Sequence, residues 1–257
     1  MRLFRLFYLI LLLPITAFAE DADLAELFAK MNVSGTIIIS SGSDGKTYIH
    51  DELRANRRYP PASTFKIPNT LIALDEKVIS VGDIFKWDGI TREVPEWNRN
   101  QTLESAFKTS CVWCYQQLAK KVGSTKYQNY LSSIGYGGLR KPFNETTFWL
   151  DGSLAISATE QIEFLKKIYR RQLPFASSSY DALGSIMLVE QNPAYSLWAK
   201  TGWAISVTPQ LGWYVGYVES PSGVWFFAMN IDIMNKEFLS LRSEIVQKSL
   251  RLKKIIQ

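Results

Sequence analysis

A serine placed three residues ahead of a lysine is the feature of this sequence with the clearest chemistry. The pair, Ser63 and Lys66, lies in the segment PASTFK at the start of an apolar run with helical spacing. One helical turn would bring both side chains onto the same face. A lysine amine acts as a base only when it is neutral, and at its ordinary pKa of about 10.4 only about one amine in a few thousand is neutral near pH 7. The pair therefore predicts a serine nucleophile and a lysine base, provided that Lys66 is buried or lies beside another cation.

The same spacing recurs twice in the chain, so the pattern alone is weak evidence. Ser43 and Lys46 flank an Asp-Gly pair between two β-rich runs, which predicts a hairpin loop. Ser105 and Lys108 lie in a predicted helical stretch that carries no second signal. Only the copy at Ser63 follows two prolines, which favour an extended approach to the start of a helix.

A plainer interpretation of Ser63 and Lys66 is also open. Ser63 can be the N-cap of a helix that begins at Thr64, with Lys66 a surface lysine. The free backbone N–H groups at that helix end would equally favour developing negative charge on Ser63. The neighbours Phe65 and Ile67 are apolar and are consistent with burial of Lys66. The choice between the two interpretations depends on that burial.

The chain has one histidine, His50, which is followed by two acids at the end of a β-rich run. This position favours a surface or strand-end role over catalysis. A Ser-His-Asp or Cys-His mechanism would need this one residue, and a zinc site built from several histidines is excluded. Any serine chemistry is therefore expected to use a lysine base, and no metal site is predicted.

The first nineteen residues are typical of a secretory signal. Arg2 and Arg5 precede an apolar run from Leu6 to Ile15, and the segment ends in Ala-Phe-Ala, after which we expect cleavage. A retained membrane anchor is the alternative, but the run is shorter than the roughly 20 residues that a spanning helix needs. We therefore predict a secreted, periplasmic protein without a stable membrane anchor.

The charge of the chain gives no sign of a nucleic-acid partner. Removal of residues 1–19 takes away two arginines and lowers the formal net charge from +5 to +3. Two basic doublets, Arg57-Arg58 and Lys253-Lys254, are too short to form a basic patch and are expected at the surface. A chain of this size predicts one compact unit with a large core and leaves a division into two subdomains open.

The two cysteines, Cys111 and Cys114, are too few for a disulfide scaffold. Within a helix their spacing would put both side chains on nearly the same side, so a bridge is conceivable. We expect instead two small buried side chains that are not bonded to each other. A thioredoxin-like redox role lacks the strand that normally precedes such a motif.

Helical and β-rich segments follow one another in blocks. A short amphipathic segment at 24–31 precedes two predicted strands, 35–40 and 46–50. Helical spacing then dominates, at 65–77, 102–122, 125–133 and 159–171, with a further short helix at 181–190. Three predicted strands, 195–201, 212–219 and 224–233, precede a final helix at 236–252.

This order predicts an α/β (α+β) fold in which the N-terminal and C-terminal strands form one antiparallel sheet flanked by helices. The helical region would be an insertion between the two groups of strands. We expect residues 1–19 to be the signal peptide and residues 20–257 to be one domain. Its sheet region would comprise 20–60 and 191–257, and its mainly helical region 61–190.

Later segments supply further candidate residues in a specific order. They are Ser110-Cys111-Val112, F-W-L-D-G at 148–152, Lys200-Thr201-Gly202, and N-I-D at 230–232 followed by Arg242. Together with PASTFK, this order closely resembles that of the class D, oxacillinase-type, serine β-lactamases over essentially the whole chain after residue 19. Penicillin-binding proteins and class A enzymes share the S-x-x-K and K-T-G elements, but carry a polar asparagine where this chain has Val112. The resemblance implies a penicillin-recognising serine hydrolase fold and hydrolysis of β-lactam antibiotics, which confers resistance.

The resemblance also implies a role for each segment. Ser63 would attack the lactam carbonyl, and Lys66, N-carboxylated by CO2 or bicarbonate, would serve as the base, with no other cofactor. Further catalytic residues would be Ser110, which relays a proton to the ring nitrogen, Trp149, whose indole N–H donates to the carbamate, and Lys200. The backbone N–H groups of Ser63 and Trp203 would form the oxyanion hole. The substrate-binding residues would be Val112, Leu150, Lys200, Thr201, Gly202 and Arg242.

One triplet departs from the family pattern, and some functions stay open. Class D enzymes usually carry Tyr-Gly-Asn where this chain reads Tyr136-Gly137-Gly138, so the role of the asparagine cannot be transferred to Gly138. A β-lactam receptor that is acylated at Ser63 without turnover, and a D-alanyl-D-alanine peptidase, are the alternatives to the hydrolase. The expected partners are small-molecule β-lactams and no nucleic acid, and the protein would be a monomer or a homodimer.

Overall fold

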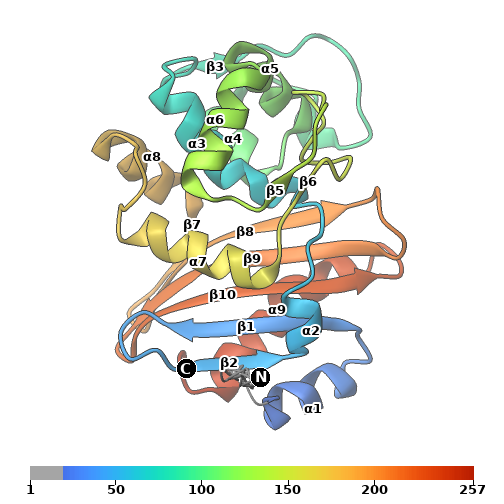
Figure 1. Cartoon of the computed structure of the whole chain (residues 1–257), viewed down its shortest axis with the longest axis vertical. Coiled ribbons are helices and arrows are strands. Elements are labelled where there is room, and N and C mark those ends of the chain that lie inside the picture. Colours follow the sequence, from blue (N-terminus) through green and yellow to red (C-terminus); the bar gives the residue numbers. More distant parts are fainter. Residues whose placement is uncertain (1–19) are drawn as a thin grey trace, which may run out of the picture.

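The computed structural model describes residues 20–257, so the predicted signal peptide at 1–19 lies outside the described residues. At the centre is a six-stranded antiparallel sheet with the strand order β2-β1-β10-β9-β8-β7 (Figure 1). The strands are β1 (Gly35–Ser41), β2 (Thr47–His50), β7 (Leu188–Gln191), β8 (Ser196–Ala204), β9 (Gln210–Ser220) and β10 (Gly223–Ile233). Because β1 pairs with β10, strands from the two ends of the chain lie in one sheet, and the predicted fold class is confirmed.

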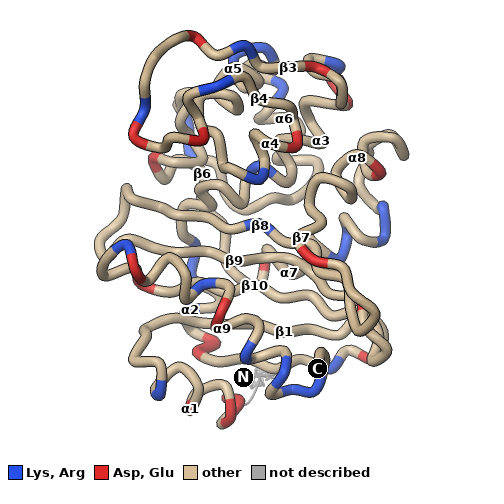
Figure 2. The backbone as a smooth tube through the Cα atoms, turned by 180° about the vertical axis from the view of Figure 1, so that it is seen from behind, with Lys and Arg blue, Asp and Glu red and all other residues tan. Residues whose placement is uncertain are grey.

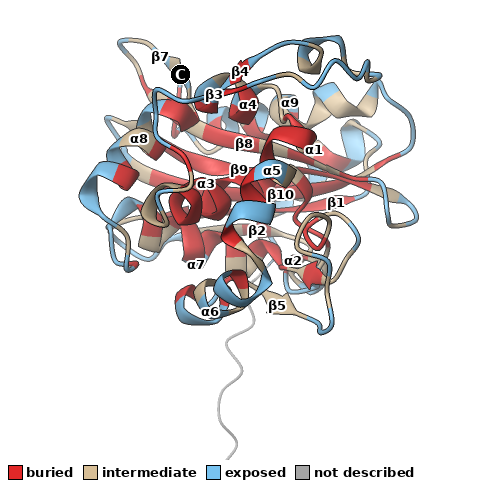
Figure 3. Cartoon of the chain, turned by 90° about the horizontal axis from the view of Figure 1, so that it is seen from above, coloured by how far each residue is buried: buried red, intermediate tan, exposed pale blue. Residues whose placement is uncertain are grey.

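Helices cover both faces of the sheet. α1 (Ala22–Lys30) and α9 (Phe238–Leu252) pack on one face over one hydrophobic core. α7 (Ala158–Tyr169) crosses the opposite face and joins the larger core there. Figure 3 shows the central strands buried between these layers. Because helices cover both faces of the sheet, the sequences of β9 and β10 are nearly continuously apolar and do not alternate between apolar and polar residues.

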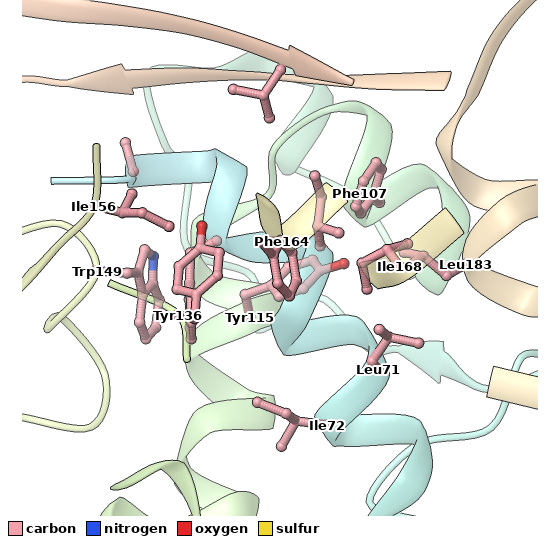
Figure 4. Close-up of a cluster of buried hydrophobic side chains, with 14 of the residues drawn as sticks. Leu71, Ile72, Phe107, Tyr115, Tyr136, Trp149, Ile156, Phe164, Ile168 and Leu183 are labelled. Carbon is pink, nitrogen blue, oxygen red and sulfur yellow. The ribbon is translucent and has the colours of Figure 1, made fainter. Parts of the chain in front are cut away.

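The helical region lies beyond the β8 side of the sheet (Figure 1). Its helices are α3 (Lys66–Asp75), α4 (Leu103–Lys108), α5 (Val112–Val122), α6 (Ser124–Ile134) and α8 (Ser177–Met187). Short elements complete the chain: α2 (Glu52–Ala55), the 3-10 turns η1 (Ala62–Phe65) and η2 (Pro95–Trp97), and two small sheets, β3 (Ile84–Phe85) with β4 (Gln101–Thr102) and β5 (Gly138–Leu139) with β6 (Leu154–Ala155). Figure 4 shows Tyr115, Tyr136 and Trp149 gathered around the segment that carries Leu71 and Ile72.

Two predicted helices are interrupted in the structure. The segment 102–122 forms two helices, α4 and α5, because the chain turns at Ser110, which has a positive φ of 58°. The segment 181–190 ends its helix at Met187 and continues as β7, which pairs with β8. That pairing depends on a strand that comes later in the chain, so local periodicity could not predict it.

The cysteine prediction was wrong, because Cys111 and Cys114 form a disulfide with a Cα–Cα distance of 5.5 Å. The expected continuous helix had placed both residues in its interior. In the structure Cys111 is the N-cap of α5, with the non-helical values φ −52° and ψ 108°. Its sulfur therefore turns back over the first turn of the helix and reaches Cys114.

Two polar predictions about the sheet region have different outcomes. His50 ends β2, where its Nδ1 lies 2.5 Å from Glu20 Oε1, so the predicted strand-end role is confirmed. Lys253 was expected at the surface, but its side chain is only 8% exposed and lies 2.6 Å from Asp21 and 2.9 Å from Asp23. Asp21 and Asp23 belong to the α1 segment. The two ion pairs of Lys253 therefore link the C-terminal end of α9 to the N-terminal end of α1.

Charged residues of both signs are interspersed over the sheet and helical regions (Figure 2). Several form local pairs along a helix, as Lys30 does with Glu26 and Lys248 with Glu244.

Within residues 20–257, no helix is both long and apolar enough to cross a membrane.

Gly216 on β9 approaches β8 so closely that a side chain cannot be added. A Cβ there would lie 2.1 Å from the Trp198 carbonyl oxygen. Gly216→Ala is expected to lower the free energy of unfolding by about 2 kcal/mol or more, because the strands must move apart. Gly184→Ala in α8 meets nothing within 4 Å and is the control, expected to raise that free energy by about 0.5–1 kcal/mol. Chemical denaturation measures both; equal stabilities would contradict this packing.

Candidate active site

Ser63 lies in η1, on a turn that is fixed from several sides. The Ala62 N–H donates to the Trp149 carbonyl at 3.0 Å, and the Trp213 indole N–H donates to the Pro60 carbonyl at 2.9 Å. Ala62 itself has a positive φ of 48°, a conformation that non-glycine residues rarely adopt. The surrounding hydrogen bonds therefore hold Ala62, the residue before Ser63, in a backbone conformation that is unfavourable for alanine.

The N-cap interpretation of Ser63 was wrong. Its side chain does not cap a helix: Pro61 precedes η1 and Phe65 precedes α3, and neither end has a side-chain cap. Instead Ser63 Oγ accepts a hydrogen bond from Lys66 Nζ at 3.4 Å. The serine and the lysine therefore face each other, as the nucleophile interpretation requires.

Lys66 is the first residue of α3, and it is only 1% exposed. Its Nζ lies 4.5 Å from the centre of the Tyr115 ring. Burial lowers the pKa of Lys66 well below its ordinary value, and the positive charge of Lys200 lowers it further. No carboxylate within residues 20–257 forms an ion pair with Lys66. A buried amine without a counterion is most stable in its neutral form, which is the form that can accept a proton.

Trp149 supplies an unusual buried group beside η1. The residue is 1% exposed, and its ring stacks on Phe65 at a centroid distance of 5.7 Å. Its indole Nε1–H is one of the few buried donors in the described chain that have no hydrogen-bond partner. A buried donor without a partner costs free energy, so this N–H is suited to an acceptor that the protein itself does not provide.

Ser110 and Lys200 form a second polar pair, although 90 residues separate them in sequence. Lys200 Nζ donates to Ser110 Oγ at 2.6 Å and to the Thr201 carbonyl at 3.0 Å. Lys200 is 4% exposed, and burial lowers its pKa to about 7, with a smaller contribution from Arg242. Near neutral pH, Lys200 can therefore both hold and release a proton.

Gly202 allows β8 to approach the nucleophile turn. A Cβ at this position would lie 3.0 Å from the Pro61 carbonyl oxygen and 3.1 Å from Thr64 Cγ2. The Gly202 carbonyl accepts a hydrogen bond from Arg242 Nη1 at 2.8 Å, and burial lowers the pKa of Arg242 to about 10. Arg242 thus remains a cation at neutral pH and is held against β8, next to Thr201.

The remaining predicted residues are Val112, Leu150 and Trp203, and they lie on three different segments. Val112 is the half-buried first residue of α5, and Leu150 packs partly buried against the larger core. Ser206 Oγ donates to the Leu150 carbonyl at 2.5 Å. Trp203 follows Gly202 on β8, and its indole donates to Gln210 at 2.9 Å. The side chain of Trp203 packs on the core under α9, so only its backbone remains for the predicted oxyanion role.

One surface groove reaches part of the predicted site, namely Lys200 and Thr201, and its lining does not include Ser63, Lys66 or Ser110. This groove has a volume of about 400 Å³, with Phe107, Tyr214 and Ser243 in its lining. A larger hollow of about 500 Å³ lies beside α8 and contains none of the predicted site residues. Arg242, which stays charged near neutral pH, lies close enough to Lys200 to lower its pKa, and no carboxylate in the described chain forms an ion pair with either residue. Such a site favours a substrate that carries a negative charge.

Tyr115 and Gln161 also support the site, and sequence reasoning missed them. Tyr115 covers Lys66 and donates or accepts a hydrogen bond with Thr70 at 2.7 Å. Gln161 on α7 donates to Thr64 Oγ1 at 3.0 Å, directly behind Ser63. Tyr115 could have been suspected, because it lies one helical turn after Val112. Gln161 gave no signal, since it stands in an ordinary amphipathic helix.

The departure at Gly138 has a structural counterpart in Arg58. A Cβ at Gly138 would lie 2.6 Å from Arg58 Nη1. Arg58 Nε donates to the Glu160 carboxylate at 2.9 Å, and Glu160 in turn forms the capping box of α7 with Ser157. An arginine held from another segment therefore occupies the space into which a side chain at position 138 would extend.

The family comparison matches most of the chain. The model of the penicillin binding protein transpeptidase domain matches residues 33–251. The chain is 40% identical to beta-lactamase OXA-48 of Klebsiella pneumoniae over 230 residues, which are 89% of this chain and 87% of that protein. It is 39% identical to beta-lactamase OXA-2 of Salmonella typhimurium over 259 residues, which are 97% of this chain and 93% of that protein.

Solved structures give the same result. The class D beta-lactamase YbXI from Nostoc has a TM-score of 0.86 at 42% identity, over 89% of this chain and 97% of that chain. FUS-1 (OXA-85), a class D beta-lactamase from Fusobacterium nucleatum subsp. polymorphum, has a TM-score of 0.90 at 32% identity, over 93% of this chain and 100% of that chain.

The pKa of Lys200 predicts how stability depends on pH. Its folded-state pKa of about 7 lies below the ordinary value of 10.5, so between these values the unfolded chain binds more protons than the folded one. The contribution of Lys200 to the free energy of unfolding should therefore rise with pH over this interval, by up to about 1.4 kcal/mol per pH unit. Lys200→Met should remove that rise. Denaturant unfolding of the wild-type protein and of Lys200→Met from pH 6 to 10 measures this pH dependence. If the free energy of unfolding of the two proteins changed in parallel with pH, the burial argument would be refuted.

Proposed function

The chain belongs to the class D β-lactamases, hydrolases that open β-lactam antibiotics and confer resistance to them, and we propose that it does so through an acyl-enzyme on Ser63. The observation that carries this mechanism is the geometry of Ser63, Lys66 and Trp149. A serine hydroxyl faces a buried amine whose pKa is strongly lowered, and a buried indole N–H without a partner lies in the same apolar region.

Lys66 is the general base in this mechanism. In the acylation step it takes the proton of Ser63 while Oγ attacks the lactam carbonyl. N-carboxylation by CO2 converts the Lys66 amine into an anionic base and gives the Trp149 N–H an acceptor. The neutral amine, the apolar surroundings and the free indole N–H all fit this modification. In the deacylation step the same side chain takes a proton from the water that attacks the acyl group.

Ser110 and Lys200 complete the proton path of acylation. When the C–N bond of the lactam breaks, the ring nitrogen needs a proton. Ser110 Oγ donates it and is resupplied by Lys200 Nζ, which lies 2.6 Å away. The lowered pKa of Lys200 makes this transfer feasible near neutral pH.

The strand β8 and the helix α9 hold the substrate. Lys200, Thr201 and Arg242 bind the carboxylate of the antibiotic, a role supported by the closeness of Arg242 to Lys200 without a paired carboxylate in the described chain. The backbone N–H groups of Ser63 and Trp203 stabilise the oxyanion, which the close packing of Gly202 against Pro61 supports. Gly202 itself lets β8 lie against the nucleophile turn, and Val112 and Leu150 form the apolar lining.

Two other functions predict different kinetics. A β-lactam receptor would be acylated at Ser63 and would not turn over, and a D-alanyl-D-alanine peptidase would act on peptides. A chromogenic cephalosporin, supplied with and without bicarbonate, distinguishes them. One stoichiometric burst without turnover would refute the hydrolase. We propose export to the periplasm, where these antibiotics act, on the basis of the signal-like segment at 1–19.

Lys66→Ala removes the base and leaves the surrounding contacts in place. Turnover of the chromogenic cephalosporin should fall by about a thousandfold or more, while circular dichroism and the melting temperature show a folded protein. Lys120→Ala, at an exposed position of α5, is the matched control and should keep full activity. Near wild-type turnover by Lys66→Ala would overturn the assignment.

The proposed carboxylation predicts a dependence on pH and CO2. Acidification protonates the Lys66 amine, so turnover in CO2-depleted buffer should fall as the pH is lowered, and bicarbonate should restore it. Trp149→Phe keeps the ring but lacks the N–H. It should need about tenfold more bicarbonate for half-maximal turnover, because a hydrogen bond to a charged group is lost. Titration with bicarbonate checks this, and an unchanged requirement in the variant would count against the role of the indole.

A further inference from the structure

The disulfide lies directly beside a residue of the proposed proton path. Cys111 follows Ser110 in the chain, and Cys114 closes the first turn of α5. Both cysteines are 0% exposed, so neither sulfur is accessible to dissolved thiols or to substrate. A thiol-exchange function of the thioredoxin kind is therefore excluded. Any role of the disulfide in catalysis must come from the backbone conformation that it restrains around Cys111.

The backbone at Ser110 needs external support. Its φ of 58° lies in the left-handed region, which costs a non-glycine residue free energy. This conformation ends α4, starts α5 and turns Ser110 Oγ toward Lys200 Nζ, 2.6 Å away. The next residue, Cys111, is fixed twice: its N–H donates to the Ala106 carbonyl at 2.9 Å, and its sulfur is bonded to Cys114. The bridge thus restrains the residue on which the Ser110 geometry depends.

Other contacts maintain the fold around this turn without the bridge. Trp97 Nε1 donates to the Thr109 carbonyl at 2.9 Å, and Trp113 Nε1 donates to the Trp97 carbonyl at 3.1 Å. The closed loop is very short, and in the chain-entropy view short loops contribute least to global stability. Loss of the bridge should therefore change the position of Ser110 more than it changes the stability of the whole protein.

We propose that the Cys111–Cys114 disulfide is a positioning element for acylation, which holds Ser110 within reach of Lys200. This inference rests on the proposed function. Both cysteines are positioning residues and touch no reacting atom. Because Ser110 acts when the ring nitrogen leaves, the bridge should matter for acylation of Ser63 and much less for deacylation, in which Lys66 is the base.

Two cysteine variants separate the bridge from the N-cap. Cys111 Sγ also accepts a hydrogen bond from the Cys114 N–H at 3.3 Å. Cys111→Ala with Cys114→Ala removes both the bridge and the cap. Cys111→Ser with Cys114→Ala removes the bridge but supplies a hydroxyl that caps the helix well. Stopped-flow measurements with a penicillin give the acylation and deacylation rate constants of each variant.

We expect the acylation rate constant to fall about tenfold or more in both variants and the deacylation rate constant to change less than twofold. Full acylation by the serine-containing variant would show that only the cap matters and would overturn the proposal. A smaller amount of folded enzyme would lower the burst amplitude and leave both rate constants unchanged, which would also overturn it. If the double alanine variant does not fold, the serine-containing variant decides the question alone.

A double-mutant cycle with Ser110→Ala gives the most specific readout. If the bridge acts through Ser110, its removal should have no further effect on acylation in the Ser110→Ala background. A persistent tenfold effect in that background would refute the proposal. The wild-type protein tests the premise separately: failure to hydrolyse a penicillin would refute the proposed function, whatever the cysteine variants do.

Discussion

The burial of one amine without a counterion is the constraint on which this structure depends. Lys66 has 1% of its surface exposed and no paired carboxylate in the described part of the chain. Burial of an ammonium ion would cost several kcal/mol, so the folded protein favours the neutral amine. The ring of Tyr115, the stacked Phe65 and Trp149, and the adjacent Ser63 all belong to this arrangement. The fold thus prepares a base by keeping water away from it.

A rigid framework makes that arrangement possible. The nucleophile turn is held between the sheet and the segment that carries Trp149, through the bonds of Pro60 to Trp213 and of Ala62 to Trp149. Glycine at position 202 lets β8 come close enough to join the framework. The antiparallel sheet brings together residues from both ends of the chain, and the inserted helices supply Ser110. The site is therefore a product of long-range packing, although its most diagnostic motif spans only a few residues.

The sequence predicted those features that local patterns encode. Strong periodicity and turn residues were enough for the sheet and most helices. Short motifs singled out Ser63, Lys66, Ser110 and Lys200, which lie in two hydrogen-bonded pairs. The bridge of Cys111 was missed, because the break in the helix comes from the positive φ at Ser110, which no residue type in that segment requires. β7 was missed because its partner strand decides its conformation. Gln161 behind Thr64 was missed because its role exists only after the α7 helix has packed against η1.

The space at Gly138 has a consequence for how this lineage can change. Arg58 fills that space and is bonded to Glu160, which caps α7. An asparagine at position 138 would push aside only the end of a long side chain that is 51% exposed, and the Ser157–Glu160 capping box does not include Arg58. The change would therefore weaken one exposed ion pair, which contributes little to stability. The residue usual in the family is thus accessible to this lineage by substitution at position 138 alone.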